Sequence, residues 1–406
     1  MKERTYGILR RIAGLILLAL ASLILVLQVP AVQTRIASSL ISRFLDKFDG
    51  KVSVSEVNIL ALNAFLLKDI TITDNDPMVT RSGLHRSDLE ANPLTDSLEG
   101  DWEPEDTLFH AGSISATFTL KGLLDGGGLH LGRVDIDDAV FNYIVEPDSI
   151  FSSNLTRIFR IVSDDEEMEL GNLFDLKTLN ARNIRYTMRS PEDSSSFSGG
   201  INYFDMDVTV SSLKGRDLRF TGGKMYAVCE SCSAKEKSGY ELLSLTGSCV
   251  VGQGKTIIDD IHLVDAWSDL RLDCYTMSYL NADQFSDYIH SVRMGVEGLH
   301  GTLGMQTINA FSGGALPDNR LILNIKDSDA EGYVDDLDIN ALHFTASTPE
   351  SDSILVGTLR GRITGLPEIE EMALDARAEG LRFAVQGLGQ FVSNWTGSAL
   401  PATVSG

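Results

Sequence analysis

The sequence predicts a mainly β protein built on one long sheet, and three observations support this class. Apolar and polar residues alternate over much of the chain after Gly50, as they do in strands with one wet and one apolar face. Turn-forming stretches such as 126–128, 222–223 and 317–319 separate these segments. The strand–helix–strand rhythm of a parallel doubly wound sheet is missing. We therefore expect an antiparallel sheet that grows by the addition of similar strand pairs.

The charge of the chain is unevenly distributed. Its 406 residues carry 34 Lys and Arg against 57 Asp and Glu, which gives a formal net charge of -23. Seven of the basic residues lie within the first 50 positions, so the remaining chain is strongly acidic. Such a body lacks the basic footprint that nucleic acids require. Because 43% of the residues are hydrophobic, the chain is also too apolar to be wholly disordered.

Residues 1–30 are predicted to form a basic cytoplasmic tip and a transmembrane anchor. In the apolar run from Ile12 to Val29, only Ser22 and Gln28 are polar, and about 20 helical residues cross a bilayer core of ~30 Å. The basic residues that precede this run place the amino terminus in the cytoplasm. A cleaved signal peptide is the alternative. With either interpretation, the acidic body lies outside the cytoplasm.

Residues 31–50 are predicted to form a short amphipathic helix after Pro30. One face of this helix is apolar, and it carries Val32, Ile36, Leu40, Ile41, Phe44, Leu45 and Phe48. The helix would either cap its own protein or lie along the outer face of the inner membrane.

The remaining chain is divided into three β segments. The first, 51–148, contains a charged, proline-containing stretch at 77–105 with no sustained period, which we interpret as a mobile insertion. The middle segment, 149–300, contains one expected helix near 282–294. The last segment, 301–406, adds further strands.

Several strands are expected to share one apolar face that requires a cover or a guest. The alternating apolar positions are Ile70 and Ile72; Ile114, Ala116, Phe118 and Leu120; Phe204, Met206, Val208 and Val210; and Leu270, Leu272 and Cys274. Among these we select Phe118, Leu120, Phe204, Met206 and Val208 as candidate lining residues of that face.

The four cysteines include one C-x-x-C motif, Cys229 to Cys232. A disulfide between them is permitted outside the cytoplasm. The motif follows a strand-like stretch rather than opening a helix, which argues against a thioredoxin-like redox site. No paired Cys or His motif lies nearby to complete a zinc site. Inert thiols and a disulfide therefore both stay open.

No catalytic or cofactor-binding motif is recognised. The acidic stretch from Asp327 to Asp338 partly matches an EF-hand loop. A strand-like run precedes it instead of a helix, which favours an acidic hairpin turn. The seven histidines are scattered, and nucleotide-binding and nucleophile-elbow motifs are missing. We therefore expect neither an enzyme nor a bound cofactor.

Several stretches resemble the TamB and AsmA-like family. Residues 28–59, with LLKDITITD at 66–74, are similar to the amino terminus of that family: an anchor, a short helix, then V-x-V-x-x-V and L-x-D-I-x-I-x-D strands. Later stretches resemble further blocks of the Bacteroidota-type TamB chain in the same order, at 106–143, 232–247, 268–279 and 361–383.

This resemblance implies a protein of outer-membrane biogenesis, anchored in the inner membrane with a periplasmic body. The body would be a long, curled β-sheet groove that carries phospholipid acyl chains between the two membranes. The alternative is a scaffold for assembling outer-membrane proteins, with an outer-membrane barrel of the assembly family as partner. TamB-type chains are longer and end in a domain with no counterpart before Gly406. The resemblance therefore covers their amino-terminal portion, and we expect either a fragment or a short relative.

Overall fold

The computed structural model describes most of the chain between residues 50 and 383. The described ranges are 50–61, 63–74, 107–118, 129–146, 149–158, 174–190, 199–281, 284, 287–314, 320–348, 351–366 and 371–383. The predicted anchor, the amphipathic helix up to residue 49 and the 77–105 insertion lie outside these ranges. No helix within them is long and apolar enough to cross a membrane.

Strands dominate the described residues, which confirms the predicted mainly β class. The first eight are β1 (Gly50–Ala61), β2 (Ala64–Asp74), β3 (Thr107–Phe118), β4 (Leu129–Glu146), β5 (Ser149–Ser153), β6 (Phe174–Arg189), β7 (Asp205–Thr221) and β8 (Lys224–Glu236). The others are β9 (Glu241–Gly252), β10 (Lys255–Asp265), β11 (Asp269–Ser278), β12 (Arg293–Gly304), β13 (Ile322–Tyr333), β14 (Asp336–Thr348), β15 (Ser351–Thr364) and β16 (Ala373–Phe383).

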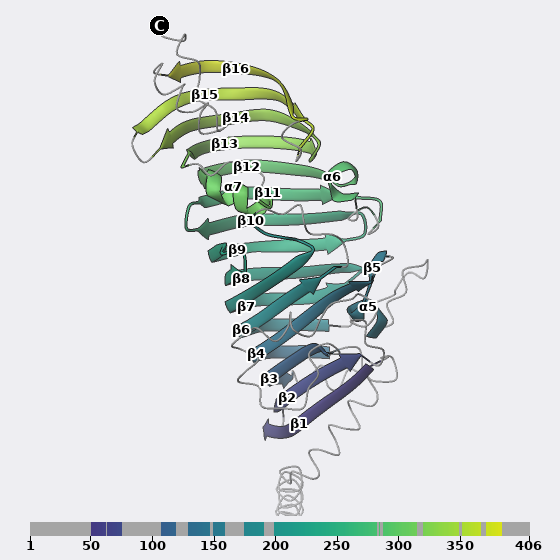
Figure 1. Cartoon of the computed structure of the whole chain (residues 1–406). Coiled ribbons are helices and arrows are strands. Elements are labelled where there is room, and N and C mark those ends of the chain that lie inside the picture. The colour runs from purple at the N-terminus through teal and green to yellow at the C-terminus, as the bar shows by residue number, and fades with distance from the viewer. Residues whose placement is uncertain are drawn as a thin grey trace, which may run out of the picture.

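These strands form one open sheet in which each strand lies beside its neighbour in the sequence (Figure 1). The path runs from β1 to β16, and β5 lies off it as a partner of β4. Strands β4 and β6 pair in parallel, whereas the other pairs are antiparallel. Adjacent strands lie about 4.8 Å apart, so the stack is roughly 70 Å long.

Three short helices accompany the sheet in the described residues. They are α5 (Asn154–Ile158), α6 (Tyr288–Ser291) and α7 (Met305–Phe311). Within the described residues, the helix expected near 282–294 corresponds to α6, and Arg293 and Met294 already belong to β12. Neither α5 nor α7 was expected from the sequence.

Helix α5 is fixed beside β4 by the amide side chain of Asn154. Its Oδ1 accepts a hydrogen bond from the N–H of Ile144 at 3.0 Å, and its Nδ2 donates to the carbonyl of Asn142 at 2.7 Å. Ile158, at the end of the helix, is fully buried. These contacts place α5 and β5 against the end of β4.

A line of left-handed residues crosses the first strands of the sheet. Asp69, Asp138 and Asn183 have φ of 47°, 56° and 55°, a region that Asp and Asn enter more easily than most other residues. Gly112 lies between Asp69 and Asp138 in the register. Asn183 Nδ2 donates to Asp138 Oδ1 at 2.6 Å. We call this line the crease.

The crease reverses the side-chain alternation within each strand. In β2, Phe65 and Leu67 precede the crease, and Ile70 and Ile72 follow it. These apolar residues are two positions apart on either side of the crease but three positions apart across it. The register pairs all four with apolar residues of β3. One extra residue, placed as in a β-bulge, therefore keeps the apolar side chains on one face.

A substitution at Asn183 tests this account of the crease. Asn183→Val puts a β-branched residue at φ 55°, and we expect it to lower the free energy of unfolding by about 1–3 kcal/mol. Asn183→Gly accepts the same φ and loses only the bond to Asp138, which costs about 1 kcal/mol. Urea denaturation of both variants measures the difference. Equal losses would contradict the backbone explanation.

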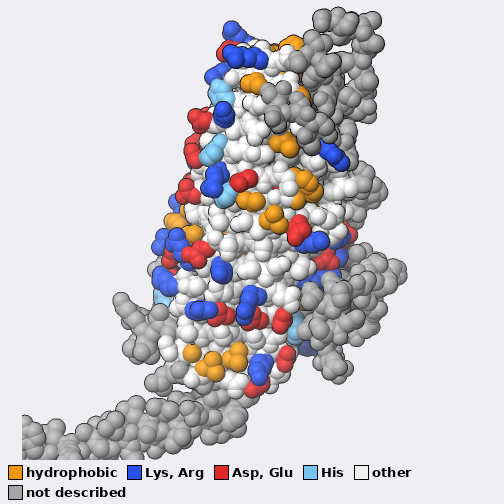
Figure 2. All heavy atoms as spheres, turned by 90° about the vertical axis from the view of Figure 1, so that its left-hand side faces the viewer, with side chains coloured by type: hydrophobic (Ala, Val, Ile, Leu, Met, Phe, Trp, Pro, Cys, Tyr) orange, Lys and Arg blue, Asp and Glu red, His pale blue; other side chains and the backbone are white. Residues whose placement is uncertain are grey.

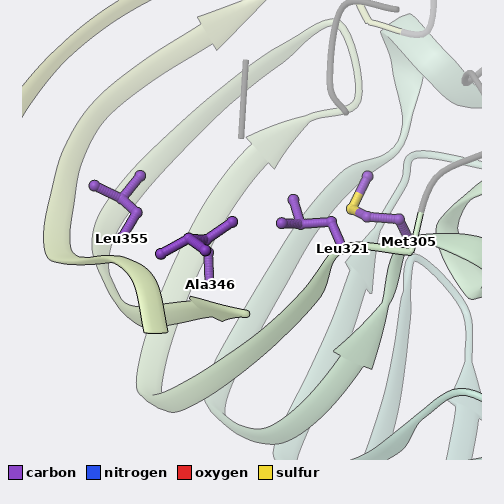
Figure 3. Packing of buried hydrophobic residues seen from close by; sticks show 5 residues of the cluster. Met305, Leu321, Ala346 and Leu355 are labelled. Atoms are coloured by element: carbon purple, nitrogen blue, oxygen red, sulfur yellow. The ribbon is translucent and has the colours of Figure 1, made fainter. Parts of the chain in front are cut away.

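One buried apolar core of the described residues lies at the carboxy-terminal part of the sheet. Met305 of α7 packs against Leu321, Ala346, Ile354 and Leu355, each at most 7% exposed. Figure 3 shows these side chains inside the bend of the strands. Helix α7 therefore lies on the same face of the sheet as Ala346 and Leu355.

Candidate functional site

One row of apolar residues runs along the sheet, and the strand register connects each member to the next. The row contains Val57, Leu67, Ile114, Ile136, Ala181, Leu213, Cys232, Leu245, Leu263, Leu270, Gly301, Ile325, Phe344 and Gly357. Directly paired residues lie on the same face of a sheet. The apolar row therefore crosses every strand of the path from β1 to β15 without a charged side chain.

Most members of the apolar row are half-buried rather than enclosed. Ala181 and Ile325 are 4% exposed, whereas Leu67, Leu213, Leu245 and most others keep part of their surface accessible. A closed core would bury such side chains fully. The apolar row is thus a surface that water or a guest can still contact.

The opposite face of the sheet carries a polar row. Its residues pair in the same way, and the equivalent row contains Glu56, Lys68, Ser113, Asp137, Arg182, Ser212 and Ser233. Glu56 and Lys68 form an ion pair at 2.8 Å, and Arg182 and Asp137 form one at 2.7 Å. Figure 2 shows acidic and basic side chains interspersed on one side of the molecule. Basic side chains therefore neutralise part of the acidic charge on this row.

Two of the five candidate lining residues lie on the apolar face within described strands. Met206 pairs with Met188, and Val208 pairs with Tyr186. Phe204 is half-buried and immediately precedes β7. The backbone of Phe118 pairs with Leu131, but its side chain lies outside the described part, as does Leu120 entirely.

Three cysteines line the apolar face, and a fourth lies on the polar face. Cys229 and Cys232 are paired with Gly247 and Leu245, and Cys249 is paired with Ala227. All four thiols are free in this structure. Burial raises the pKa of Cys229, Cys232 and Cys249. Thiols of this kind are poor nucleophiles at neutral pH, and the disulfide between Cys229 and Cys232 stays a prediction.

Cys274 was expected to alternate with Leu270 and Leu272, but it lies on the opposite face. It pairs with Asp259 and Glu297, and burial together with Asp259 raises its pKa to about 11. The cause is again an extra residue, since Tyr275 rather than Cys274 continues the apolar face by pairing with Ile258.

A buried polar cluster attaches α7 to the apolar face. The carboxylate of Asp265 accepts the Thr307 hydroxyl at 2.8 Å and the N–H groups of Trp267 and Ser268 at 2.7 Å. The Ser268 hydroxyl lies 2.6 Å from that of Thr307 and accepts the Gly304 N–H at 3.0 Å. Burial and the neighbouring Asp265 raise the pKa of Tyr240. The amino end of α7 is thereby fixed to the β10–β11 turn.

The acidic stretch from Asp327 to Asp338 forms a hairpin rather than a helix–loop–helix. Asp327 lies inside β13 with φ 44°, and Asp338 lies inside β14, so the two do not belong to one loop. Within the residues that the structure describes, no group of three or more His, Cys, Asp or Glu side chains is arranged to hold a metal ion.

Sequence reasoning missed the two features that organise this face. The crease was missed because its signal is a single Asp or Asn within a strand-like run, as at Asp138. Helix α7 was missed because seven residues are too few for a clear helical period.

No protein-family model and no curated protein matches the chain.

Proposed function

We propose that this protein is a periplasmic conduit for phospholipid, anchored in the inner membrane and belonging to the TamB and AsmA-like family that its sequence resembles. The observation that carries the proposal is the apolar row, which extends from β1 to β15. A half-buried apolar surface roughly 70 Å long matches a guest that presents acyl chains and moves along the sheet. The anchor and the location rest on the apolar run at residues 12–29.

The energetics of acyl-chain contact favour this kind of guest. Each CH₂ group removed from water contributes about 0.8 kcal/mol, and the half-buried side chains of Leu213 and Leu245 already exclude part of the water. The polar face, with its ion pairs such as Arg182–Asp137, gives the sheet a soluble exterior. One face would therefore hold the chains while the other faces the periplasm.

Site-specific photocrosslinking tests the proposal. A photoreactive amino acid at Val208 should crosslink phospholipid in intact cells, because Val208 lies on the apolar face. The matched control is Thr209, the next residue of β7, which pairs with Arg185 on the polar face. We expect strong lipid adducts at Val208 and background labelling at Thr209. Equal labelling at both positions would remove the support for a conduit.

A second function is favoured by the last described strand of the sheet. Leu374, Leu381 and Phe383 of β16 are 54%, 45% and 48% exposed, and β15 is the only described partner of β16. An open edge can accept a further strand, which suits a scaffold that assembles outer-membrane barrels. Under this function, crosslinks from β16 to nascent barrel proteins would exceed lipid crosslinks from Val208.

A further inference from the structure

Helix α7 lies along one rim of the apolar face. It follows β12, yet its contacts reach back as far as the connection between β6 and β7. The N–H of Ile201 donates to the carbonyl of Ala310 at 2.8 Å, and the Tyr203 hydroxyl donates to the carbonyl of Phe311 at the same distance. The ring of Phe311 meets Tyr240 edge-on at 5.0 Å between centroids. The helix therefore crosses the ends of several strands.

These contacts form a clasp between two chain segments, 199–204 and 309–314. A Cβ atom on Gly200 would lie 2.7 Å from the carbonyl oxygen of Ala310, and one on Gly314 would lie 1.9 Å from that of Gly199. Both glycines have positive φ, of 100° and 86°. The two backbones can thus approach closely only because these positions are glycine.

Helix α7 covers surface that would otherwise extend the apolar face. Beneath it, Leu321 and Ala346 are fully buried, and Ile308 packs against the same cluster. Seven residues do not form a stable helix alone, and α7 does not belong to the strand ladder. Its position depends on the Asp265 cluster, the clasp and this apolar contact.

Aromatic and apolar side chains are exposed around α7. Phe311 and Tyr203 are each 42% exposed, and Trp267 is 39% exposed. Tyr and Trp favour boundaries between apolar and aqueous surroundings. Figure 2, which looks at the side where α7 lies in Figure 1, shows hydrophobic side chains among the charged ones on the upper half and a further group near the lower end.

We propose that this rim is the lateral port through which single phospholipid molecules enter and leave the apolar face, with α7 as the wall that moves aside. The proposal rests on the conduit function above. The acyl chains would pass beneath α7 onto the surface now covered by Met305 and Ile308. The headgroup would stay outside, beside Tyr203 and Trp267.

A reversible disulfide, called the staple, tests whether α7 must move for lipid to enter. In the full-length protein with its four cysteines replaced, Ile201→Cys and Ala310→Cys would join the two segments of the clasp. The probe is an acyl-labelled fluorescent phospholipid in phosphatidylethanolamine–phosphatidylglycerol vesicles. We expect the oxidised staple to slow uptake by about tenfold, as expected for a gated site, and reductant to restore it. The same cysteine-free chain without the pair controls for the redox treatment.

Weakening the contacts that hold α7 in place should accelerate uptake of the fluorescent phospholipid. Thr307→Val with Ser268→Ala removes the bond from the Thr307 hydroxyl to Asp265 and the contacts of the Ser268 hydroxyl with Thr307 and the Gly304 N–H, so α7 would open more often. A photoreactive residue at Phe311 should crosslink the lipid, whereas one at Leu280, which is 85% exposed in the β11–β12 connection, should not. Circular dichroism confirms that each variant keeps its sheet.

The outcomes separate the port from the conduit. If stapled and reduced proteins take up lipid equally fast, the port is wrong and the conduit stands. If Leu280 labels as strongly as Phe311, entry is not confined to this rim and the port is again wrong. If neither form takes up lipid and Val208 gives no lipid adduct, both proposals fail.

Discussion

Arg185→Ala is expected to lower the free energy of unfolding by about 3–5 kcal/mol, as removal of one partner from a buried ion pair does. The Arg185 guanidinium donates to both carboxylate oxygens of Asp207, at 2.9 and 2.6 Å. The two side chains are 7% and 17% exposed. Without Arg185, the Asp207 carboxylate would lose both of these hydrogen bonds in a poorly hydrated position. Urea denaturation followed by circular dichroism measures the loss.

Arg182 provides the matched control on the same strand. Its Nε lies 2.7 Å from Asp137 Oδ1, but the Arg182 side chain is 71% exposed. We expect Arg182→Ala to cost no more than about 1 kcal/mol, because water screens an exposed pair. The double variant Arg185→Met with Asp207→Leu should recover most of the stability, since neither charge is then left alone. If Arg182→Ala costs as much as Arg185→Ala, burial is not the cause of the difference.

Local alternation was sufficient to predict the class of the fold and part of its apolar face. Met206 and Val208 could be placed because β7 alternates regularly between residues 206 and 210, before its irregularity at 211–212. Most of the strand order could also be predicted, because every strand of the path after β1, except β6, pairs with the strand that precedes it in the chain. Such pairing depends on local connections and needs no long-range information.

The side chains that follow the crease in each strand could not be assigned to a face from the sequence. Their alternation depends on one residue of the strand adopting a left-handed backbone conformation. At Asp138, one residue adopts a left-handed conformation and reverses which side chains lie on the apolar face. Aspartate is also common in ordinary turns, so an aspartate in the sequence does not by itself indicate a left-handed residue inside a strand. Cys274 illustrates the consequence, since strict alternation places it on the wrong face.

The rim at α7 could not be predicted for a different reason. Asp265, Ser268 and Thr307 are small polar residues with no motif spacing, separated by up to 42 positions. These residues come together only in the folded sheet, where β10, β11 and β12 lie side by side and the β10–β11 turn lies at the start of α7. Burial then makes their hydrogen bonds important, because an unsatisfied carboxylate such as that of Asp265 would be costly.

A charge in the middle of the apolar row should weaken phospholipid binding by about tenfold while the sheet stays folded. Leu213 is half-buried, and its register partners are Ala181 and Cys232. Under the proposed conduit function, Leu213→Glu would place a carboxylate in the path of the acyl chains, and each CH₂ that can no longer contact the face loses about 0.8 kcal/mol. Two such groups suffice for about a tenfold loss of affinity. Bound phospholipid per purified protein, measured by mass spectrometry, checks this result.

The control variant is Ser212→Glu, which adds the same charge one residue away on the opposite face. Ser212 pairs with Arg182, so the new carboxylate would lie beside a cation and in contact with water. We expect lipid binding to be unchanged in Ser212→Glu and in the conservative variant Leu213→Met. Because both positions belong to β7, a loss confined to Leu213→Glu would locate the guest on the apolar face. An equal loss in Ser212→Glu would mean that net charge, rather than contact with acyl chains, governs the association.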